Sequence, residues 1–319
     1  MQPDPRPILS IGDLVWDVLS RPDHELLAGG DTLGRITLAP GGSAANTAVW
    51  IARAGMPSSF VGKVGEDVMG NLLVADMQRE GVQAYAPRGT QDTGVILVLI
   101  DPLTGQRSTV INQGADYHLL PDELPVQALQ TCRHLHVTAW SLFTDPPRMA
   151  VIRAAQIAKA AGATVSLDPA SHQVIHEMGV EQFARLTADL PVDMLFPNRD
   201  EGAALSGEHE PARIAHALRR RYPGATIVLK LDRDGCYVLA DNHEAHYPTT
   251  EVEVLDTTGA GDSFDAAFLA RYMRDGDLAS AARFANRVAR WVVARFGARP
   301  TVDEAFTKIL LQTSMTNDE

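Results

Sequence analysis

The sequence predicts an α/β fold, in which helices cover a mainly parallel β-sheet. Short apolar or β-branched runs alternate with longer amphipathic stretches through most of the chain, which is the pattern that such a sheet produces. Gly55 and Gly162 follow two of the amphipathic stretches, at positions where glycine commonly ends a helix. The 319 residues are 45% hydrophobic and 21% charged, so the chain can bury a sizeable core and is unlike disordered proteins.

Several apolar runs are expected to be strands of the buried sheet, because each is bounded by glycine, proline or polar turn residues. These runs are Ile8–Ile11, Ser59–Val64, His134–Thr138, Thr164–Leu167, Met194–Phe196 and Thr226–Lys230. The clearest helical patterns lie between them, at Ala44–Ala54, Pro147–Ala161, Pro211–Tyr222, Gly261–Arg274 and Leu278–Arg295.

Two stretches, about 14–40 and 93–111, interrupt this alternation. Leu14–Pro40 and Thr93–Ile111 contain short strand-like runs separated by glycine, aspartate and proline, without a convincing helix. Both leave and rejoin the α/β body near its first strands, so we expect them to pair into a small β-strand lid. Such a lid would cover the carboxyl ends of the parallel strands, where ligands of these sheets bind. We therefore expect one domain over residues 1–319 with the lid as its appendage.

The charge balance opposes two classes of partner. The chain has 28 lysines and arginines against 40 aspartates and glutamates, a net charge of −12, which disfavours binding to nucleic acid or anionic membranes. Cys132 and Cys236 form neither a disulfide framework nor a metal-binding spacing. The N-terminal residues lack a basic region, and no apolar run approaches the ~18 residues of a membrane span. We therefore expect a cytoplasmic protein.

The segment 256–264, Asp-Thr-Thr-Gly-Ala-Gly-Asp-Ser-Phe, is the most informative one. It leads from a strand-like run into a predicted helix, so the amides of Gly259, Ala260 and Gly261 would converge on an anion such as phosphate. Asp262 in the first helical turn would accept a proton from a hydroxyl beside that anion, as phosphoryl transfer to an alcohol requires. The alternative is a glycine turn before a helix that an acidic residue stabilises. The Walker A pattern of P-loop enzymes is absent.

A second segment, residues 40–48, precedes the first predicted helix. Gly41 and Gly42 allow a small ligand to approach the backbone, and the Asn46 amide can donate to and accept from hydroxyl groups, which suits a polyol. The alternative is a helix capped by Ser43 with Asn46 exposed. Two carboxylates, Asp13 and Asp17, follow the first strand and can point into the same cleft; ordinary turn chemistry is the alternative for both.

With both segments in this order, the sequence resembles the ribokinase (pfkB) family of carbohydrate kinases over nearly its whole length. The resemblance implies a ribokinase-like three-layer α/β/α sandwich. It also implies that Asp262 is the general base and that Gly259, Ala260 and Gly261 line the anion hole. The positions that match sugar-binding residues of the family are Asp17, Gly41, Gly42 and Asn46, with Asp13 in the same loop.

The same resemblance implies a site for ATP and Mg²⁺. Asn198 and Glu201 match an N-x-x-E pattern that organises water around magnesium, although a helix N-terminus alone would produce the same residues. Lys230–Gly235 resembles the nucleotide loop, with Asp232 where the family usually has glycine; aspartate can adopt the left-handed backbone that the turn needs. Asn286 matches a residue that faces adenine, or is a polar residue on an amphipathic helix.

The resemblance further implies a monovalent cation, K⁺, beside Asp256 and Thr258, and pairing of two copies through the lid. We expect the chain to transfer the γ-phosphate of ATP to a hydroxyl of a small sugar or sugar acid, as ribokinase, fructokinase or 2-keto-3-deoxygluconate kinase does. A nucleoside kinase and a catalytically silent sugar-binding protein are the alternatives. Ser166–Ser171 lacks the Asn and Arg of some fructokinase and sugar-acid kinase relatives, and Arg107 in the lid is either a surface arginine or a ligand for a substrate anion.

Overall fold

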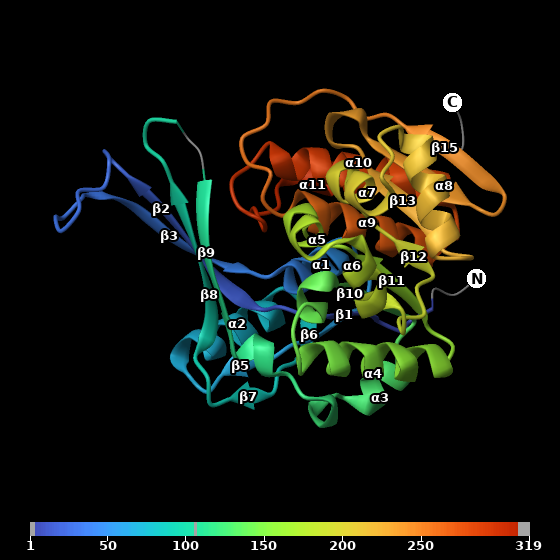
Figure 1. Cartoon of the computed structure of the whole chain (residues 1–319), viewed down its shortest axis with the longest axis horizontal. Helices are drawn as coiled ribbons and strands as arrows, with labels where there is room; N and C mark the ends of the chain where they lie inside the picture. Colours follow the sequence, from blue (N-terminus) through green and yellow to red (C-terminus); the bar gives the residue numbers. More distant parts are fainter. Residues whose placement is uncertain (1–3, 105–106, 312–319) are drawn as a thin grey trace.

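A mostly parallel sheet runs through the centre of the molecule, as the alternating pattern predicted (Figure 1). The computed structural model describes residues 4–104 and 107–311. Nine strands pair in the order β15 (His243–Tyr247), β14 (Cys236–Ala240), β13 (Thr226–Lys230), β12 (Met194–Leu195), β11 (Thr164–Asp168), β10 (His134–Thr138), β1 (Ile8–Ile11), β4 (Ser58–Val61), β6 (Val82–Tyr85). Only the β13–β14 and β14–β15 pairs in this sheet are antiparallel.

Helices cover both faces of the sheet because successive side chains of each buried strand point to opposite sides. Ile8 packs in one core and Leu9 in the other. The Ile8 side is covered by α1 (Ser43–Arg53), α9 (Ala260–Asp275), α10 (Leu278–Val293) and α11 (Glu304–Leu311). The Leu9 side is covered by α3 (Val126–Thr131), α4 (Pro147–Ala160), α5 (His172–Met178), α6 (Val180–Thr187), α7 (Arg199–Ser206) and α8 (Pro211–Arg221).

A third apolar core joins the first helix to α2 (Val68–Arg79). Leu73 and Met77 of α2 pack with Ala45 and Val49 of α1 and with Phe60 of β4. A two-stranded sheet of β5 (Val64–Gly65) and β7 (Arg88–Gly89) lies beside this region. No helix in the described residues is both long enough and apolar enough to cross a membrane.

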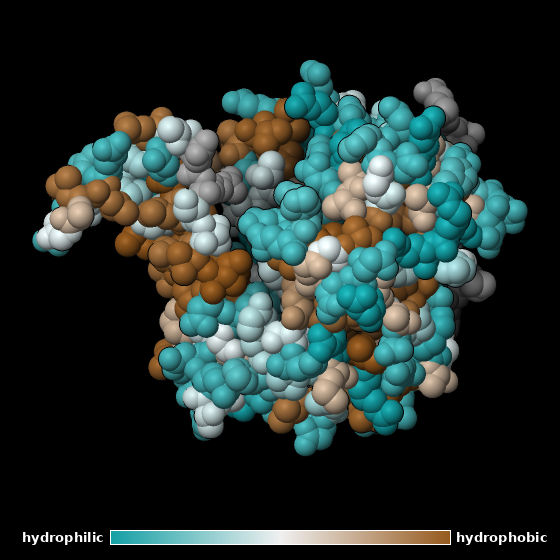
Figure 2. Space-filling model, in the orientation of Figure 1, coloured by the Kyte–Doolittle hydropathy of each residue, from teal (hydrophilic) through white to brown (hydrophobic). Residues whose placement is uncertain are grey.

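The two interrupting stretches form a separate four-stranded sheet that extends from one side of the body (Figure 1). Its order is β3 (Gly34–Gly41), β2 (Val15–Pro22), β8 (Thr93–Ile100) and β9 (Arg107–Gly114). We call it the appended sheet. Figure 2 shows hydrophobic side chains gathered over it, and Ile36, Leu38 and Val110 are among those that are more than half exposed.

Candidate active site

Two cavities open at the carboxyl ends of the central strands, and they meet at one carboxylate. The larger has a volume of about 780 Å³ and the smaller about 210 Å³. Ser43, Gly261 and Asp262 line both. Of the other predicted residues, the larger cavity is lined by Asn198, Glu201, Lys230, Gly235, Ala260 and Asn286, and the smaller by Asp13, Asp17, Gly42, Asn46, Thr258 and Gly259. Gly41 and Asp256 lie outside both linings.

The glycine turn before α9 places two backbone donors between the cavities. Gly259 has a φ of 73°, and a Cβ there would lie 2.6 Å from Ala298 Cα, so no other residue fits. Ala260 N–H donates to Thr257 O at 3.2 Å, which corrects the prediction that this amide is free for an anion. Within the described chain, the N–H groups of Gly261 and Asp262 have no acceptor, as expected at a helix N-terminus. These two amides and the helix dipole make this turn suited to an anion.

The Asp262 carboxylate is set apart from bulk water. Burial raises its pKa to about 7; Asp168 and Asp13 add to this rise, while a hydrogen bond from Asn46 and the charge of Lys230 oppose it. Asn46 Nδ2 donates to Asp262 Oδ2 at 2.7 Å. A carboxylate with a pKa near neutrality can take up a proton and release it again.

Asp13 anchors the start of α1 from outside the helix. Its carboxylate accepts from the N–H groups of Ser43 at 3.0 Å and Ala44 at 3.1 Å, so Asp13 caps the helix and Ser43 does not, contrary to the alternative drawn from the sequence. Gly42 has a φ of 97°, and a Cβ there would lie 2.3 Å from Asp13 O. The two glycines therefore allow the chain to pass close to the Asp13 loop.

One face of the appended sheet forms a wall of the smaller cavity. Asp17 on β2 pairs with Ile96 on β8, which pairs with Ile111 on β9, so the three side chains share this face. Burial, and next the charge of Asp13, raise the pKa of Asp17 to about 6. Gln113 and Trp140 complete the lining, and Gln113 Oε1 is buried without a hydrogen-bond partner in the described part of the chain. The sequence analysis identified neither residue, because each lies in a segment without a recognisable motif.

In the larger cavity, Asn198 and Glu201 form a reciprocal capping box at the start of α7. Asn198 Oδ1 accepts from Glu201 N–H, and Glu201 Oε2 accepts from Asn198 N–H, both at 2.8 Å. Both residues therefore form a helix N-terminus, which is the alternative that the sequence offered. They nevertheless also line the cavity. Burial, with the nearby charge of Asp168, raises the pKa of Glu201 to about 8.

Lys230 lies in a buried charge cluster that the sequence analysis did not foresee. Its Nζ is 2.7 Å from Asp168 Oδ2 and 3.1 Å from Asp265 Oδ1. Although burial opposes its charge, these carboxylates raise the pKa of Lys230. A Cβ on Gly261 would lie 3.5 Å from Nζ, so the ammonium group sits directly behind the glycine turn.

The turn after β13 keeps its shape without the usual glycine. Asp232 has a φ of 53°, so the predicted left-handed aspartate is confirmed. Gly235 has a φ of 86°, and a Cβ there would lie 2.1 Å from Tyr247 O. Asn286 Nδ2 donates to the same Tyr247 O at 2.9 Å, which holds Asn286 at the cavity wall.

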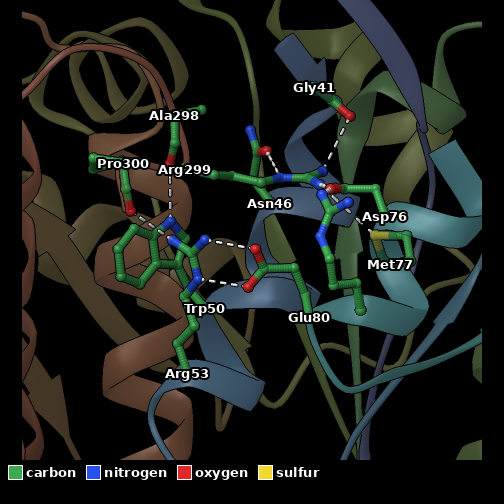
Figure 3. Close-up of polar contacts among 11 residues, drawn as sticks. Gly41, Asn46, Trp50, Arg53, Asp76, Met77, Glu80, Ala298, Arg299 and Pro300 are labelled. Carbon is green, nitrogen blue, oxygen red and sulfur yellow. Dashed lines mark hydrogen bonds and ion pairs between the residues drawn. The ribbon is translucent and has the colours of Figure 1, made fainter. Parts of the chain in front are cut away.

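The segment 297–300, after α10, holds the site together from behind and was missed entirely by the sequence analysis. Gly297 N–H donates to Asp256 Oδ2 at 2.9 Å, and Asp256 Oδ1 accepts from Thr258 N–H and Oγ1 at 2.9 and 2.6 Å. Arg299 Nε donates to Asn46 Oδ1 at 2.7 Å (Figure 3). A lone arginine after a helix has no sequence signature that predicts burial.

The oxygen ligands around the larger cavity suit a hard divalent cation. Glu201, Asn198 and Asp168 line it together, and carboxylate and amide oxygens are the ligands that Mg²⁺ prefers. The described residues contain no cluster of three or more His, Cys, Asp or Glu that would enclose a metal. A cation here would therefore keep several waters, as Mg²⁺ does beside phosphates. The Arg107 side chain lies outside the described residues.

Residues 6–305 match the model of the pfkB family carbohydrate kinases. The chain is 31% identical over 302 residues to an ATP-dependent ribose-1-phosphate kinase of Halopiger xanaduensis, covering 93% of this chain and 95% of that protein. It is also 31% identical over 265 residues to a fructokinase of Klebsiella pneumoniae, covering 82% of each. A provisionally named ribokinase II of E. coli, solved with ATP and Mg²⁺, has the same fold, with a TM-score of 0.82, 22% identity, and coverage of 96% of this chain and 99% of that one.

The family match spans both glycine segments, the two cavities and the carboxylate between them. The chain belongs to the pfkB family of carbohydrate kinases, which are phosphotransferases that act on a hydroxyl group of a sugar.

Proposed function

We propose that this kinase transfers the γ-phosphate of ATP, bound with Mg²⁺ in the larger cavity, to a hydroxyl of a neutral sugar in the smaller cavity. The observation that carries the proposal is that the two cavities share Asp262 and Gly261. An alcohol held on one side of Asp262 would face a phosphate held on the other, with a proton acceptor and backbone donors at the junction.

In this proposal, Asp262 accepts the hydroxyl proton as the sugar oxygen attacks the γ-phosphorus in line, and the bond from the γ-phosphorus to the bridging oxygen breaks to release ADP. The N–H groups of Gly261 and Asp262 donate to the transferred phosphoryl group, and Gly259 shapes the turn that exposes them. Lys230 behind the turn adds positive charge there. When bound, Mg²⁺ would neutralise charge on the phosphates, and Asn198 and Glu201 would hold its waters.

The nucleotide would lie along the apolar wall of the larger cavity. Val252, Val254, Ala289 and Val293 line that wall and offer a surface for a purine ring. Gly235 and Asn286 shape the adjoining turn through their contacts with Tyr247. The ATP dependence of the Halopiger kinase and the ATP and Mg²⁺ bound in the E. coli structure support ATP as the donor.

The sugar would be held by hydrogen-bonding groups at and beside the smaller cavity. Asp13, Asp17, Gly42 and Asn46 line the smaller cavity, and the backbone of Gly41 precedes Gly42 in the same turn. Gln113 Oε1, which has no hydrogen-bond partner in the described part of the chain, would accept from a sugar hydroxyl. The appended sheet, acting as a lid, would exclude water through Ile96 and Ile111.

The charge of the smaller cavity selects the substrate class. Three carboxylates line it, Asp13, Asp17 and Asp262, and no lysine or arginine does among the side chains that the structure describes. A sugar acid or a sugar phosphate would place a further negative charge beside them, so a neutral sugar is favoured.

The substrate class is tested by scoring ADP release with ribose, fructose, 2-keto-3-deoxygluconate, ribose 1-phosphate and adenosine. We expect the highest kcat/KM with a neutral sugar. A higher value with either anion would overturn the charge argument, and activity confined to adenosine would establish a nucleoside kinase. Sugar binding by calorimetry without ADP release from any compound would indicate a silent binding protein.

The role of Asp262 is tested by Asp262→Asn, which keeps the size of the side chain but removes its basicity. We expect a loss in kcat on the order of 10³-fold, with the sugar still bound. Asp241→Asn, at a carboxylate that is 83% exposed, is the matched control and should keep wild-type turnover. Near-normal turnover of Asp262→Asn would show that another group accepts the proton.

Two finer points complete the proposal. A monovalent cation such as K⁺ would bind beside Asp256 and Thr258, next to the glycine turn, and replacing K⁺ with tetramethylammonium should then lower kcat. Two copies would pair through the outer face of the appended sheet, where Val18 pairs with Leu38 and Leu97, and Leu97 with Val110. A continuous apolar face of this kind favours a partner surface.

A further inference from the structure

Arg299 is a buried cation that is linked to the proposed base, Asp262, through one intermediate side chain. Its side chain is 6% exposed. Nε of Arg299 donates to Asn46 Oδ1, and Asn46 Nδ2 donates to Asp262 Oδ2, both at 2.7 Å. Figure 3 shows the guanidinium directed at the Asn46 amide from the segment after α10. The three groups form a chain that runs from the back of the site to its centre.

The chemistry of the guanidinium fixes which way the amide faces. Arginine carries only donors, so the Asn46 atom that faces it must be the oxygen, and the NH₂ group must then face Asp262. Without Arg299, a half-turn of the amide would place Oδ1 against an ionised carboxylate, where neither atom carries a proton. The amide would then no longer hold Asp262 in one position.

The Arg299 side chain is itself held in place by contacts on several sides, so it can fix the position of the Asn46 amide. Its Nη1 is 3.0 Å from Asp76 Oδ2 on α2, and its Nη2 donates to Gly41 O at 3.3 Å. The neighbouring backbone is tied to α1, because Trp50 Nε1 donates to Ala298 O at 2.9 Å and Arg53 Nη1 to Pro300 O at 3.0 Å (Figure 3).

We propose that Arg299 is a positioning residue for phosphoryl transfer, which locks the Asn46 amide in the orientation that donates to Asp262. Arg299 acts through Asn46 and is not part of either cavity lining. The inference rests on the proposed role of Asp262 as the base. Arg299 also joins the base to the end of β3, so the carboxylate and the root of the appended sheet share one anchor.

The charged and polar groups that face Asp262 come from several elements. They are Asn46 on α1, Asp13 after β1, Asp168 on β11 and Lys230 on β13. Among them, only Asn46 donates a hydrogen bond to the Asp262 side chain in the described chain. Loss of that donor would raise the pKa of Asp262 further, because the bond stabilises its ionised form.

The test compares Arg299→Gln with Arg53→Gln in the full chain. Arg53 is the matched control, because it holds the same segment at Pro300 O and pairs with Glu80, but does not contact Asn46. We expect Arg299→Gln to lower kcat roughly tenfold or more and to move the rising limb of the pH–kcat/KM profile to higher pH. Arg53→Gln should lower the melting temperature and leave kcat and the profile close to wild type.

Two further variants separate positioning from folding. Arg299→Lys keeps a cation for Asp76 but lacks the guanidinium fork, so we expect it to fold. If Arg299→Gln does not fold, Arg299→Lys takes its place and should show the same shift of the pH profile. In an Asn46→Ala background, Arg299→Gln should cause no further loss in kcat, because the side chain through which it acts is already gone.

A wild-type pH profile in both Arg299 variants, a full additional loss in the Asn46→Ala background, or the same shift in Arg53→Gln would each overturn the inference. These outcomes are distinct from failure of the proposed function. If Asp262→Asn abolishes turnover while the Arg299 variants behave as wild type, only the positioning role is lost. If Asp262→Asn stays active, Asp262 is not the base, and the proposed function fails independently of the Arg299 variants.

Discussion

Asp262 combines burial with a single strong donor, and this combination sets its chemistry. Burial raises its pKa to about 7, so near neutral pH about half of the molecules carry the ionised form that can accept a proton. We expect kcat/KM to rise with pH and to level off above about 7. Initial rates in overlapping buffers at constant ionic strength would measure this. A flat profile from pH 5 to 9 would contradict the assigned base.

Because it is buried, the ionised Asp262 side chain destabilises the folded chain at alkaline pH. Its folded-state pKa of about 7 lies above the ordinary value of 3.8, so between these values the folded chain holds a proton that the unfolded chain releases. The free energy of unfolding therefore falls as pH rises towards 7. Asp262→Asn avoids this loss, so its free energy of unfolding at pH 8 should exceed that of the wild type by on the order of 2 kcal/mol. Urea unfolding at pH 8 and pH 5 would test it, because the difference should shrink at pH 5.

At the scale of elements, short turns decide where the site residues stand. The turn η4 (Asp232–Asp234) after β13 has Asp232 in the left-handed region, which aspartate tolerates better than alanine. We expect Asp232→Ala to lower the free energy of unfolding by about 1 kcal/mol and Asp232→Gly to keep or raise it. Chemical denaturation of both variants checks this. Equal stabilities for the two would show that the backbone conformation carries no cost.

Strands near the two ends of the central sheet escaped the sequence analysis, whereas the strands in its middle were identified. Ile8–Ile11 and His134–Thr138 were predicted with their observed bounds, because both faces of each are covered and each is an apolar run. The strands β6, β14 and β15 were missed. β15 alternates between buried and exposed positions at the sheet edge, and its sequence, His-Glu-Ala-His-Tyr, contains no apolar run. The predicted strand Ser59–Val64 is in fact two, β4 and β5.

At the scale of the whole molecule, the appended sheet presents two different faces. The face with Asp17, Ile96 and Ile111 lines the smaller cavity, and the opposite face carries Leu38, Leu97 and Val110. In the proposed dimer, Leu97→Lys should shift the equilibrium towards the monomer, because it places a charge at the centre of that apolar face. Sedimentation equilibrium at micromolar concentration measures this. Val68→Lys, at a residue of α2 that is 71% exposed, should leave the mass unchanged.

The sequence by itself determined the α/β class, most buried strands, and the two glycine segments with Asp262, Asn46 and Asp17. These follow from local chemistry: apolar periodicity, glycine where backbone must approach backbone, and a carboxylate in a first helical turn. Only the tertiary structure decided that Asp13 caps α1, that Lys230 lies between Asp168 and Asp265, and that Arg299 holds Asn46. Such contacts join residues up to 253 positions apart, and a buried polar group finds its partner in three dimensions, which no local pattern encodes.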